Sequence, residues 1–263
     1  MSEKFLSKEH SLQPPNETLH LPRILCLHGG GVTGNIFRLQ ARALIKHLPN
    51  FRLVFAEAPF FSDPGPGIVP VYEQYGPFRR WLRWRPKHPE IDNEVAVKMI
   101  ISSLERCKRE DRGFGPWVAL LGFSQGAKIA ASLLYDQQIR MEKEGKAHTN
   151  YTFAVLLAGR GPLISFCDYS ASPALMTASQ MSLESFVYPE KSPHVLRLPT
   201  IHMHGLQDPG LYWHKKMLKL YHDPKASTLI EWDGAHRVPL KRADVMKLAA
   251  EICRVAQEQG IDV

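Results

Sequence analysis

The sequence lacks any long hydrophobic run. Its longest uninterrupted apolar stretches, such as residues 117–121 and 153–158, are far shorter than the about 18 residues that indicate a membrane-spanning helix. Residues 1–21 are polar and charged, with no apolar stretch of signal-peptide length. We therefore expect a soluble protein of the cell interior, cytoplasmic, with no membrane among its partners.

Cysteine is scarce, and its spacing suggests no site. The four cysteines stand singly, without a C-x-x-C or Cys/His ligand pattern: Cys26, Cys107, Cys167 and Cys253. In a chain that is not secreted, this indicates reduced thiols rather than a disulfide framework. We accordingly expect no structural zinc and no other metal site.

The overall composition is that of a globular protein. Of the 263 residues, 44% are hydrophobic and 22% are charged, which excludes disordered and collagen-like classes. The 33 Lys and Arg exceed the 26 Asp and Glu, which gives a net charge of +7. That surplus favours acidic partners in general and does not choose among them.

Short apolar runs alternate with amphipathic stretches from residue 22 onward. The runs predict strands at residues 23–28, 52–57, 117–123, 152–158, 200–204 and 227–232, and their continuous hydrophobicity is typical of strands buried on both faces. Apolar residues at helical spacing predict helices around 97–104 and 245–252, and an Ala-rich stretch predicts one at 127–134. We expect one α/β domain at 22–263, with a mostly parallel sheet of six or more strands and helices on both faces, preceded by a flexible arm at 1–21.

Two long segments interrupt this rhythm, at about 60–89 and 163–197. Irregular segments of that length in a compact domain are usually functional, so we interpret them as lid or substrate loops. Aromatic residues in or near them are candidate substrate contacts: Phe60, Tyr75, Phe78, Trp81 and Trp213.

A candidate nucleophile stands where a predicted strand meets a predicted helix. The motif Gly-Phe-Ser-Gln-Gly at 122–126 matches G-x-S-x-G, in which the serine occupies a tight strand-to-helix turn. The alternative is that Ser124 only caps the helix. The strand–turn–helix context favours the nucleophile.

A serine nucleophile needs a base and an orienting acid, in the chain order Ser, Asp/Glu, His. His236 follows the last predicted strand, at the sheet edge where doubly wound folds place their sites. Asp208 follows the preceding strand and can reach the imidazole of His236. Asp233 competes for this role, but it lies three residues before the histidine on one short loop.

The first strand ends in a glycine-rich turn that can supply a main-chain N–H to an oxyanion. We assign the two donors to Gly30 and Gln125, with Gly31 or Val32 as alternatives to Gly30. Phosphate binding is the other use of such a turn. We discount it because no G-x-x-x-x-G-K-[ST] motif is present.

Together these motifs resemble the fungal serine hydrolase family of α/β-hydrolases. The motifs are His-Gly-Gly-Gly at 28–31, Glu-Ala-Pro at 57–59, Gly-Phe-Ser-Gln-Gly at 122–126, His-Gly-Leu-Gln-Asp at 204–208 and Gly-Ala-His at 234–236. The resemblance implies a triad of Ser124, Asp208 and His236 that needs no metal or organic cofactor. The stretch 65–81 is similar to stand-alone hydrolases of fungal polyketide gene clusters, which implies a thioesterase that releases or proofreads acyl chains on a polyketide synthase.

The basic run at 79–88, with four Arg and one Lys around two Trp, departs from the family pattern. It is either a solvated loop packed through its Trp rings or a docking surface for an acidic acyl-carrier domain. Stacking on single-stranded nucleic acid is discounted, because no matching fold accompanies the run. Three functions stay open: a carrier thioesterase, a small-molecule carboxylesterase or deacylase, and a non-catalytic binding module, against which the ordered triad argues.

Overall fold

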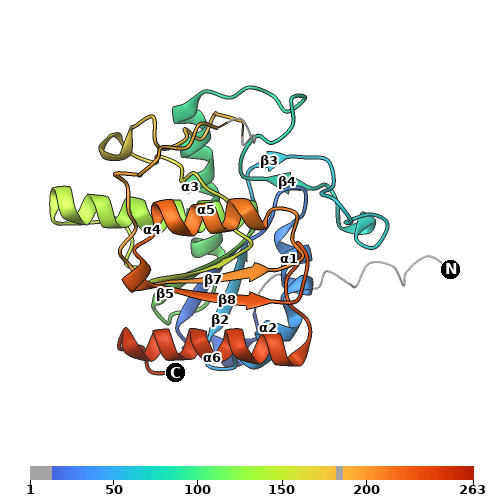
Figure 1. Cartoon of the computed structure of the whole chain (residues 1–263). Helices are drawn as coiled ribbons and strands as arrows, with labels where there is room; N and C mark the ends of the chain where they lie inside the picture. The colour runs from blue at the N-terminus through green and yellow to red at the C-terminus, as the bar shows by residue number, and fades with distance from the viewer. Residues whose placement is uncertain (1–13, 182–185) are drawn as a thin grey trace.

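The six predicted strands form one parallel sheet in the order β2-β1-β5-β6-β7-β8 (Figure 1). The computed structural model describes residues 14–181 and 186–263. The strands are β1 (Arg23–Leu27), β2 (Arg52–Ala56), β5 (Trp117–Phe123), β6 (Phe153–Leu157), β7 (Thr200–Gly205) and β8 (Ser227–Trp232). The strands β2, β1, β5, β6 and β7 are buried almost throughout, which explains their unbroken apolar sequences.

Helices cover both faces of the sheet, as predicted. On one face lie α1 (Gly34–Gln40), α2 (Arg42–His47) and α6 (Arg242–Glu258); on the other lie α3 (Asn93–Glu110), α4 (Gln125–Glu144) and α5 (Leu211–Tyr221) (Figure 1). Each face has its own apolar core, with Leu104 and Leu134 in one and Leu44 and Leu248 in the other. The fold class predicted from the sequence is confirmed.

The segment predicted as a loop at 60–89 contains a small second sheet. The strands β3 (Phe60–Phe61) and β4 (Arg79–Arg80) pair in antiparallel fashion. The chain between them contains the 3₁₀ turn η2 (Glu73–Tyr75). Arg79 also pairs with the turn after β1, because the Gly31 N–H donates to the Arg79 carbonyl at 2.8 Å. The segment is thereby attached to the main sheet.

Residues 14–21 of the predicted arm are described by the structure and contact the domain. The 3₁₀ turn η1 (Asn16–Thr18) is held by Arg52, whose Nη1 donates to the Pro15 carbonyl at 3.0 Å and to Thr18 Oγ1 at 2.8 Å. The same guanidinium pairs with the buried carboxylate of Asp111 at 2.5 Å. Residues 1–13 of the predicted arm lie outside the described residues.

The segment 163–197 lies on the face that carries α3, α4 and α5 (Figure 1). It contains the 3₁₀ turn η3 (Asp168–Ser170), and a fourth turn, η4 (Pro224–Ala226), precedes β8. Residues 182–185 of this segment lie outside the described residues. Among the helices of the described chain, none has the length and apolar character needed to cross a membrane.

Candidate active site

Ser124 occupies a strained turn between β5 and α4. Its φ of 54° lies in the left-handed region, which is costly for a residue with a side chain. Its N–H donates to the Leu157 carbonyl on the neighbouring strand at 2.8 Å, which fixes the turn. A Cβ on Gly122 would lie 2.3 Å from the Gly126 carbonyl, and one on Gly126 would lie 2.0 Å from the Leu27 carbonyl. Both glycines of the motif are therefore required by close backbone packing.

The structure brings Ser124, His236 and Asp208 together as predicted. His236 Nε2 lies 2.9 Å from Ser124 Oγ, and His236 Nδ1 lies 2.7 Å from Asp208 Oδ2. Because a carboxylate only accepts, Nδ1 carries the ring proton and Nε2 is free to accept the serine hydroxyl proton. Asp233 is directed elsewhere, since its carboxylate accepts a hydrogen bond from Gln207.

Asp208 is a buried carboxylate with two donors. Its Oδ1 accepts the Gly210 N–H at 2.7 Å, and its Oδ2 accepts the imidazole N–H of His236. Burial raises the pKa of Asp208, but the hydrogen bonds from His236 and Gly210 outweigh burial and leave the pKa below its usual value. The acid is thus held ionised beside the imidazole.

Several further histidines are buried behind Asp208. His214 Nε2 lies 3.8 Å from Asp208 Oδ2, and burial lowers the pKa of His214 to about 3, with the carboxylate opposing the shift. Burial likewise lowers the pKa of His204 and of His222 to about 4. These buried imidazoles are therefore neutral near pH 7. His236, in contrast, is exposed to solvent.

The two predicted oxyanion donors have free N–H groups. In the described part of the chain, no acceptor bonds the main-chain N–H of Gly30 or of Gln125. The alternative donor Gly31 is already engaged with the Arg79 carbonyl. The geometry therefore favours Gly30 over Gly31.

Buried polar groups hold the glycine turn in place. The Ala58 N–H donates to His28 Nε2 at 3.0 Å, so the ring proton of His28 is on Nδ1 and donates to the Gly29 carbonyl at 2.6 Å. Trp81 Nε1 donates to the His28 carbonyl at 2.9 Å. His28 is therefore a structural residue of the turn.

The predicted aromatic contacts are mostly internal. Trp81 has no exposed surface, and its indole N–H donates to the His28 carbonyl, so its role as a substrate contact stays a prediction. Phe60 and Phe78 are buried, the latter in a small cluster against which Tyr75 packs. Trp213 is half-buried and stacks on Tyr188 at 5.6 Å between ring centroids.

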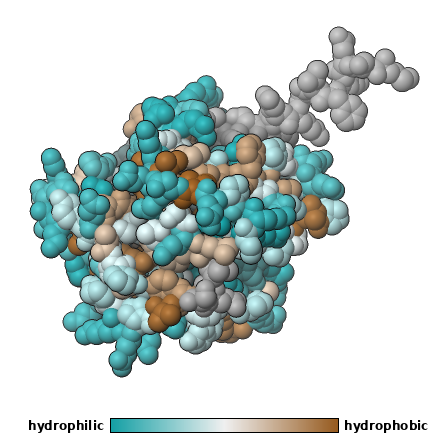
Figure 2. All heavy atoms as spheres, turned by 90° about the horizontal axis from the view of Figure 1, so that it is seen from above, coloured by the Kyte–Doolittle hydropathy of each residue, from teal (hydrophilic) through white to brown (hydrophobic). Residues whose placement is uncertain are grey.

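The basic run 79–88 is largely paired within the chain. Arg83 pairs with Glu90, and Arg85 and Lys87 share Asp63 at 3.4 and 2.7 Å. The guanidiniums of Arg79 and Arg80 lie over the rings of Phe61 and Phe60. Seen from above, this side of the molecule mixes hydrophilic groups with small hydrophobic clusters (Figure 2). The contacts favour the packed loop over a free basic surface.

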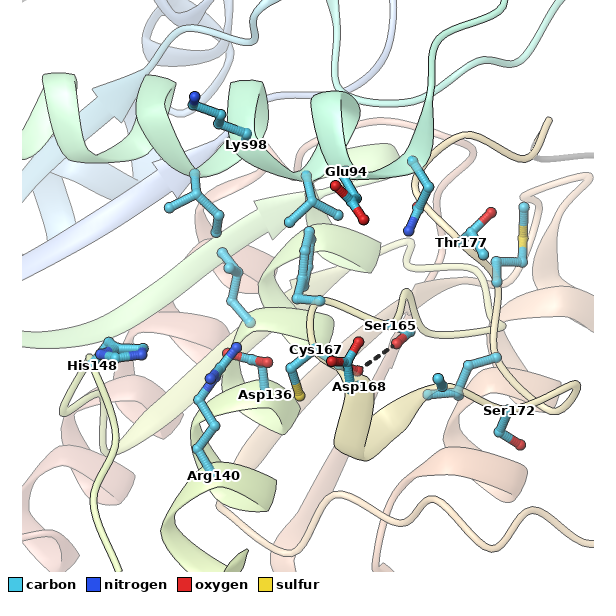
Figure 3. A pocket seen from close by; sticks show the side chains of 18 of the residues that line it. Glu94, Lys98, Asp136, Arg140, His148, Ser165, Cys167, Asp168, Ser172 and Thr177 are labelled. Carbon is cyan, nitrogen blue, oxygen red and sulfur yellow. Dashed lines mark hydrogen bonds and ion pairs between the residues drawn. The ribbon is translucent and has the colours of Figure 1, made fainter. Parts of the chain in front are cut away.

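A large cavity lies apart from these residues, between α3, α4 and residues 165–180 (Figure 3). Its volume is about 870 Å³. Polar groups at one end come from Asp136, Arg140 and His148. The apolar lining residues include Leu133 and Phe166. The segment 163–197 thus lines a cavity, but Ser124 and the segment 60–89 contribute nothing to its lining.

Within the described residues, one group of side chains is close enough together that it could hold a metal ion. Atoms of Asp208, His214 and His236 lie within 4.8 Å of one another. A cation there would displace the proton that joins His236 to Asp208. The hydrogen-bonded arrangement is the one that suits a serine hydroxyl at Nε2.

Two polar side chains at this edge of the sheet were missed by the sequence analysis. Trp84 Nε1 is buried without a partner in the described chain, 3.4 Å from where a Cβ on Gly30 would stand. Arg160 follows β6 and lies against Gly210 in the loop of Asp208. Neither residue belongs to a motif, so no signal short of the fold could have found them.

The fold is shared with solved esterases and thioesterases. The Zea mays acyl-protein thioesterase 2 superimposes with a TM-score of 0.53 at 17% identity, covering 92% of this chain and 96% of that one. The Bacillus cereus carboxylesterase gives a TM-score of 0.50 at 15% identity, with 89% of each chain covered. Sheet order and turn geometry together define an α/β-hydrolase.

The sequence comparisons then identify the family. The model of the serine hydrolase family FSH1 matches residues 18–248, and the chain belongs to that family. It is 53% identical to "Probable esterase tazC" of Aspergillus terreus (92% of this chain, 94% of the relative) and 50% identical to "Esterase citA" of Monascus ruber (95% and 98%). The protein is therefore a serine hydrolase that cleaves ester bonds.

Proposed function

We propose that the chain hydrolyses acyl thioesters, and that it releases or edits a polyketide-type acyl chain held on a synthase carrier domain. The observation that supports the catalytic part is the pair of hydrogen bonds that links Ser124 to His236 and His236 to Asp208, at 2.9 and 2.7 Å. The similarity of residues 65–81 to hydrolases of fungal polyketide clusters supports the substrate class.

In the proposed reaction, Ser124 Oγ attacks the acyl carbonyl while its proton passes to His236 Nε2. The carbonyl oxygen becomes an oxyanion that the Gly30 and Gln125 N–H groups stabilise. The bond to sulfur breaks, and the imidazolium returns the proton to the leaving thiolate. Water then attacks the acyl-enzyme, losing its proton to His236, which passes it to Ser124 as the acid product leaves. Asp208 holds the ring orientation and stabilises the imidazolium throughout.

A second candidate is a carboxylesterase or deacylase that acts on small oxoesters. Two relatives, "Probable esterase tazC" and "Esterase citA", are named as esterases, which favours it. The same Ser124, His236 and Asp208 would perform both reactions, because the two substrates differ in the leaving atom and not in the attacked carbonyl. Membership of a serine hydrolase family sets aside the non-catalytic binding module.

A matched substrate pair distinguishes the two candidates. One acyl group is prepared both as its N-acetylcysteamine thioester and as its simple oxoester, with Ser124→Ala as the blank. We expect a Ser124-dependent preference for the thioester that exceeds the difference in uncatalysed lability. Equal enhancements, or a preference for the oxoester, would replace the thioesterase with the carboxylesterase. Activity retained in Ser124→Ala would refute the proposed nucleophile itself.

A further inference from the structure

Among residues 14–181 and 186–263, Arg160 has no counterion, and it lies beside the candidate active site. It is partly buried on the loop that follows β6. In the described ranges, 14–181 and 186–263, no hydrogen bond, ion pair or ring contact involves its guanidinium. An arginine is always charged, and removing it from water without an anionic partner is costly.

The backbone of this loop is held from three sides. The carbonyl of Leu157 accepts the Ser124 N–H, and the Ala158 N–H donates to the Met203 carbonyl at 3.0 Å. Farther on, the Tyr188 hydroxyl donates to the Gly161 carbonyl at 2.7 Å. Arg160 therefore stands on a main chain that is held in place. It follows Leu157, whose carbonyl fixes the Ser124 turn, by three residues.

Its guanidinium lies against the loop of the candidate acid. A Cβ on Gly210 would stand 2.6 Å from Arg160 Nη2 and 3.0 Å from His214 Nε2. Gly210 is the residue whose N–H donates to Asp208 Oδ1. Arg160 thus lies against the Asp208 loop, at the carboxyl edge of the sheet.

The charges around Arg160 do not neutralise it. Lys128, one turn into α4, is buried, and burial together with Arg160 lowers the pKa of its ammonium to about 7. His214 is a neutral imidazole and Tyr188 a neutral phenol. The carboxylate of Asp208 already accepts from His236 and Gly210. The described residues therefore place no unpaired negative charge next to Arg160.

We propose that Arg160 determines specificity by binding an anionic oxygen of the substrate. The guanidinium fork suits a carboxylate, an acidic enolate or a phosphate. The group is either carried by the acyl chain or is the phosphate of a phosphopantetheine leaving group. This inference rests on the proposed function, since it concerns the substrate of Ser124.

Two substrate pairs test the proposal and separate the two sources. The acyl pair is the glutaryl thioester and its neutral isostere, the glutaramoyl thioester, both on N-acetylcysteamine. The leaving-group pair is butyryl-phosphopantetheine and butyryl-pantetheine. We expect Arg160→Gln to lower kcat/KM about ten- to hundredfold for the charged member of one pair, with the neutral members within about twofold of the parent chain. Arg160→Lys should recover part of the loss.

Inhibition by free glutarate gives a second readout, measured against hydrolysis of a neutral ester. Its inhibition constant should rise at least tenfold in Arg160→Gln if the acyl chain supplies the anion. Lys241→Gln is the matched control, since Lys241 is exposed and its side chain caps nothing. The proposal is overturned if Arg160→Gln slows charged and neutral substrates equally, or if Lys241→Gln reproduces its effect. The rate of Ser124→Ala is subtracted from every measured rate. If Ser124→Ala keeps its activity, the proposed nucleophile fails, and this result is distinct from a failure of the Arg160 proposal.

Discussion

The side chain of Gln125 and the backbone of Leu82 are joined by hydrogen bonds in both directions. The Leu82 N–H donates to Gln125 Oε1 at 3.0 Å, and Gln125 Nε2 donates to the Leu82 carbonyl at 3.1 Å. The Trp81 N–H adds a third bond to the same oxygen at 2.7 Å. Because Gln125 follows Ser124, the segment 60–89 is fixed directly to the start of α4.

Gln125→Ala keeps the main-chain N–H that we assign to the oxyanion but removes this attachment. We expect kcat/KM to fall at least tenfold, with a loss of about 1–3 kcal/mol in the free energy of unfolding. Gln137→Ala is a matched control, because Gln137 bonds the backbone of Tyr151 in both directions at 2.8 Å, away from Ser124. It should lose stability and keep activity. Equal activity losses in the two variants would remove the special role of Gln125.

Asp208→Asn should lower kcat by about 10³–10⁴-fold, because an amide does not hold the His236 tautomer that accepts the serine proton. Steady-state kinetics with a chromogenic ester measure the effect, and circular dichroism confirms that the variant folds. Asp233→Asn is the control, since Asp233 bonds only Gln207 in the described chain. If Asp233→Asn proved the more damaging change, our assignment of the acid would be wrong.

The buried histidines predict a loss of stability in mild acid. Their pKa values lie below the ordinary 6.5: about 4 for His204 and His222, about 3 for His214, all lowered chiefly by burial. Between these values and 6.5, the unfolded chain binds more protons than the folded one. Stability is therefore complete above about pH 6.5 and falls as the pH drops, by up to about 1.4 kcal/mol per pH unit for each histidine.

Urea unfolding from pH 4.5 to 8 measures this slope. His222→Gln should flatten it, whereas His148→Gln, at an exposed position, should leave it unchanged. A slope that is the same in both variants would show that other groups titrate in this range.

The ion pair between Arg52 and Asp111 predicts a large effect on stability alone. Asp111 also lies 3.3 Å from Arg23, and its carboxylate is buried. Asp111→Asn leaves two guanidiniums without a charged partner, so we expect a loss of about 3–5 kcal/mol. Denaturant titration measures it. Below the melting temperature kcat should stay within about twofold, and a larger change would mean that the amino end of the sheet influences the site.

Docking of a carrier domain on the basic run 79–88 can be tested at two of its cations. Arg85 and Lys87 share Asp63 and remain partly exposed. If they dock an acidic carrier domain, Arg85→Glu with Lys87→Glu should slow turnover of carrier-bound thioester and leave N-acetylcysteamine thioesters unaffected. The comparison is made at low and at 0.5 M salt, where the difference should vanish. Equal slowing of both substrates would leave the run as a packed loop.

Most of the sheet could be predicted because its strands are buried on both faces. Each predicted strand agrees with the observed one to within one residue at either end, since apolar runs end where the chain leaves the core. The places of Ser124, Asp208 and His236 could be predicted too, because parallel strands bring their carboxyl ends to one edge. Their catalytic roles stay predictions.

Other features follow from contacts that a sequence does not encode locally. The strands β3 and β4 have two residues each, which is too short for the alternation of apolar and polar residues that identifies a strand in a sequence. The burial of Trp81 depends on a carbonyl 53 positions away in the chain. That no carboxylate of the described residues pairs with Arg160 is visible only in the folded chain.

The bond between the Gly31 N–H and the Arg79 carbonyl has a consequence for divergence among relatives. It joins main-chain atoms only, so almost any side chain at position 79 preserves it. Residues 62–78, between β3 and β4, can therefore change in sequence while the turn beside Ser124 keeps its shape. A chain built in this way can accumulate point mutations in that segment without disturbing the geometry at Ser124.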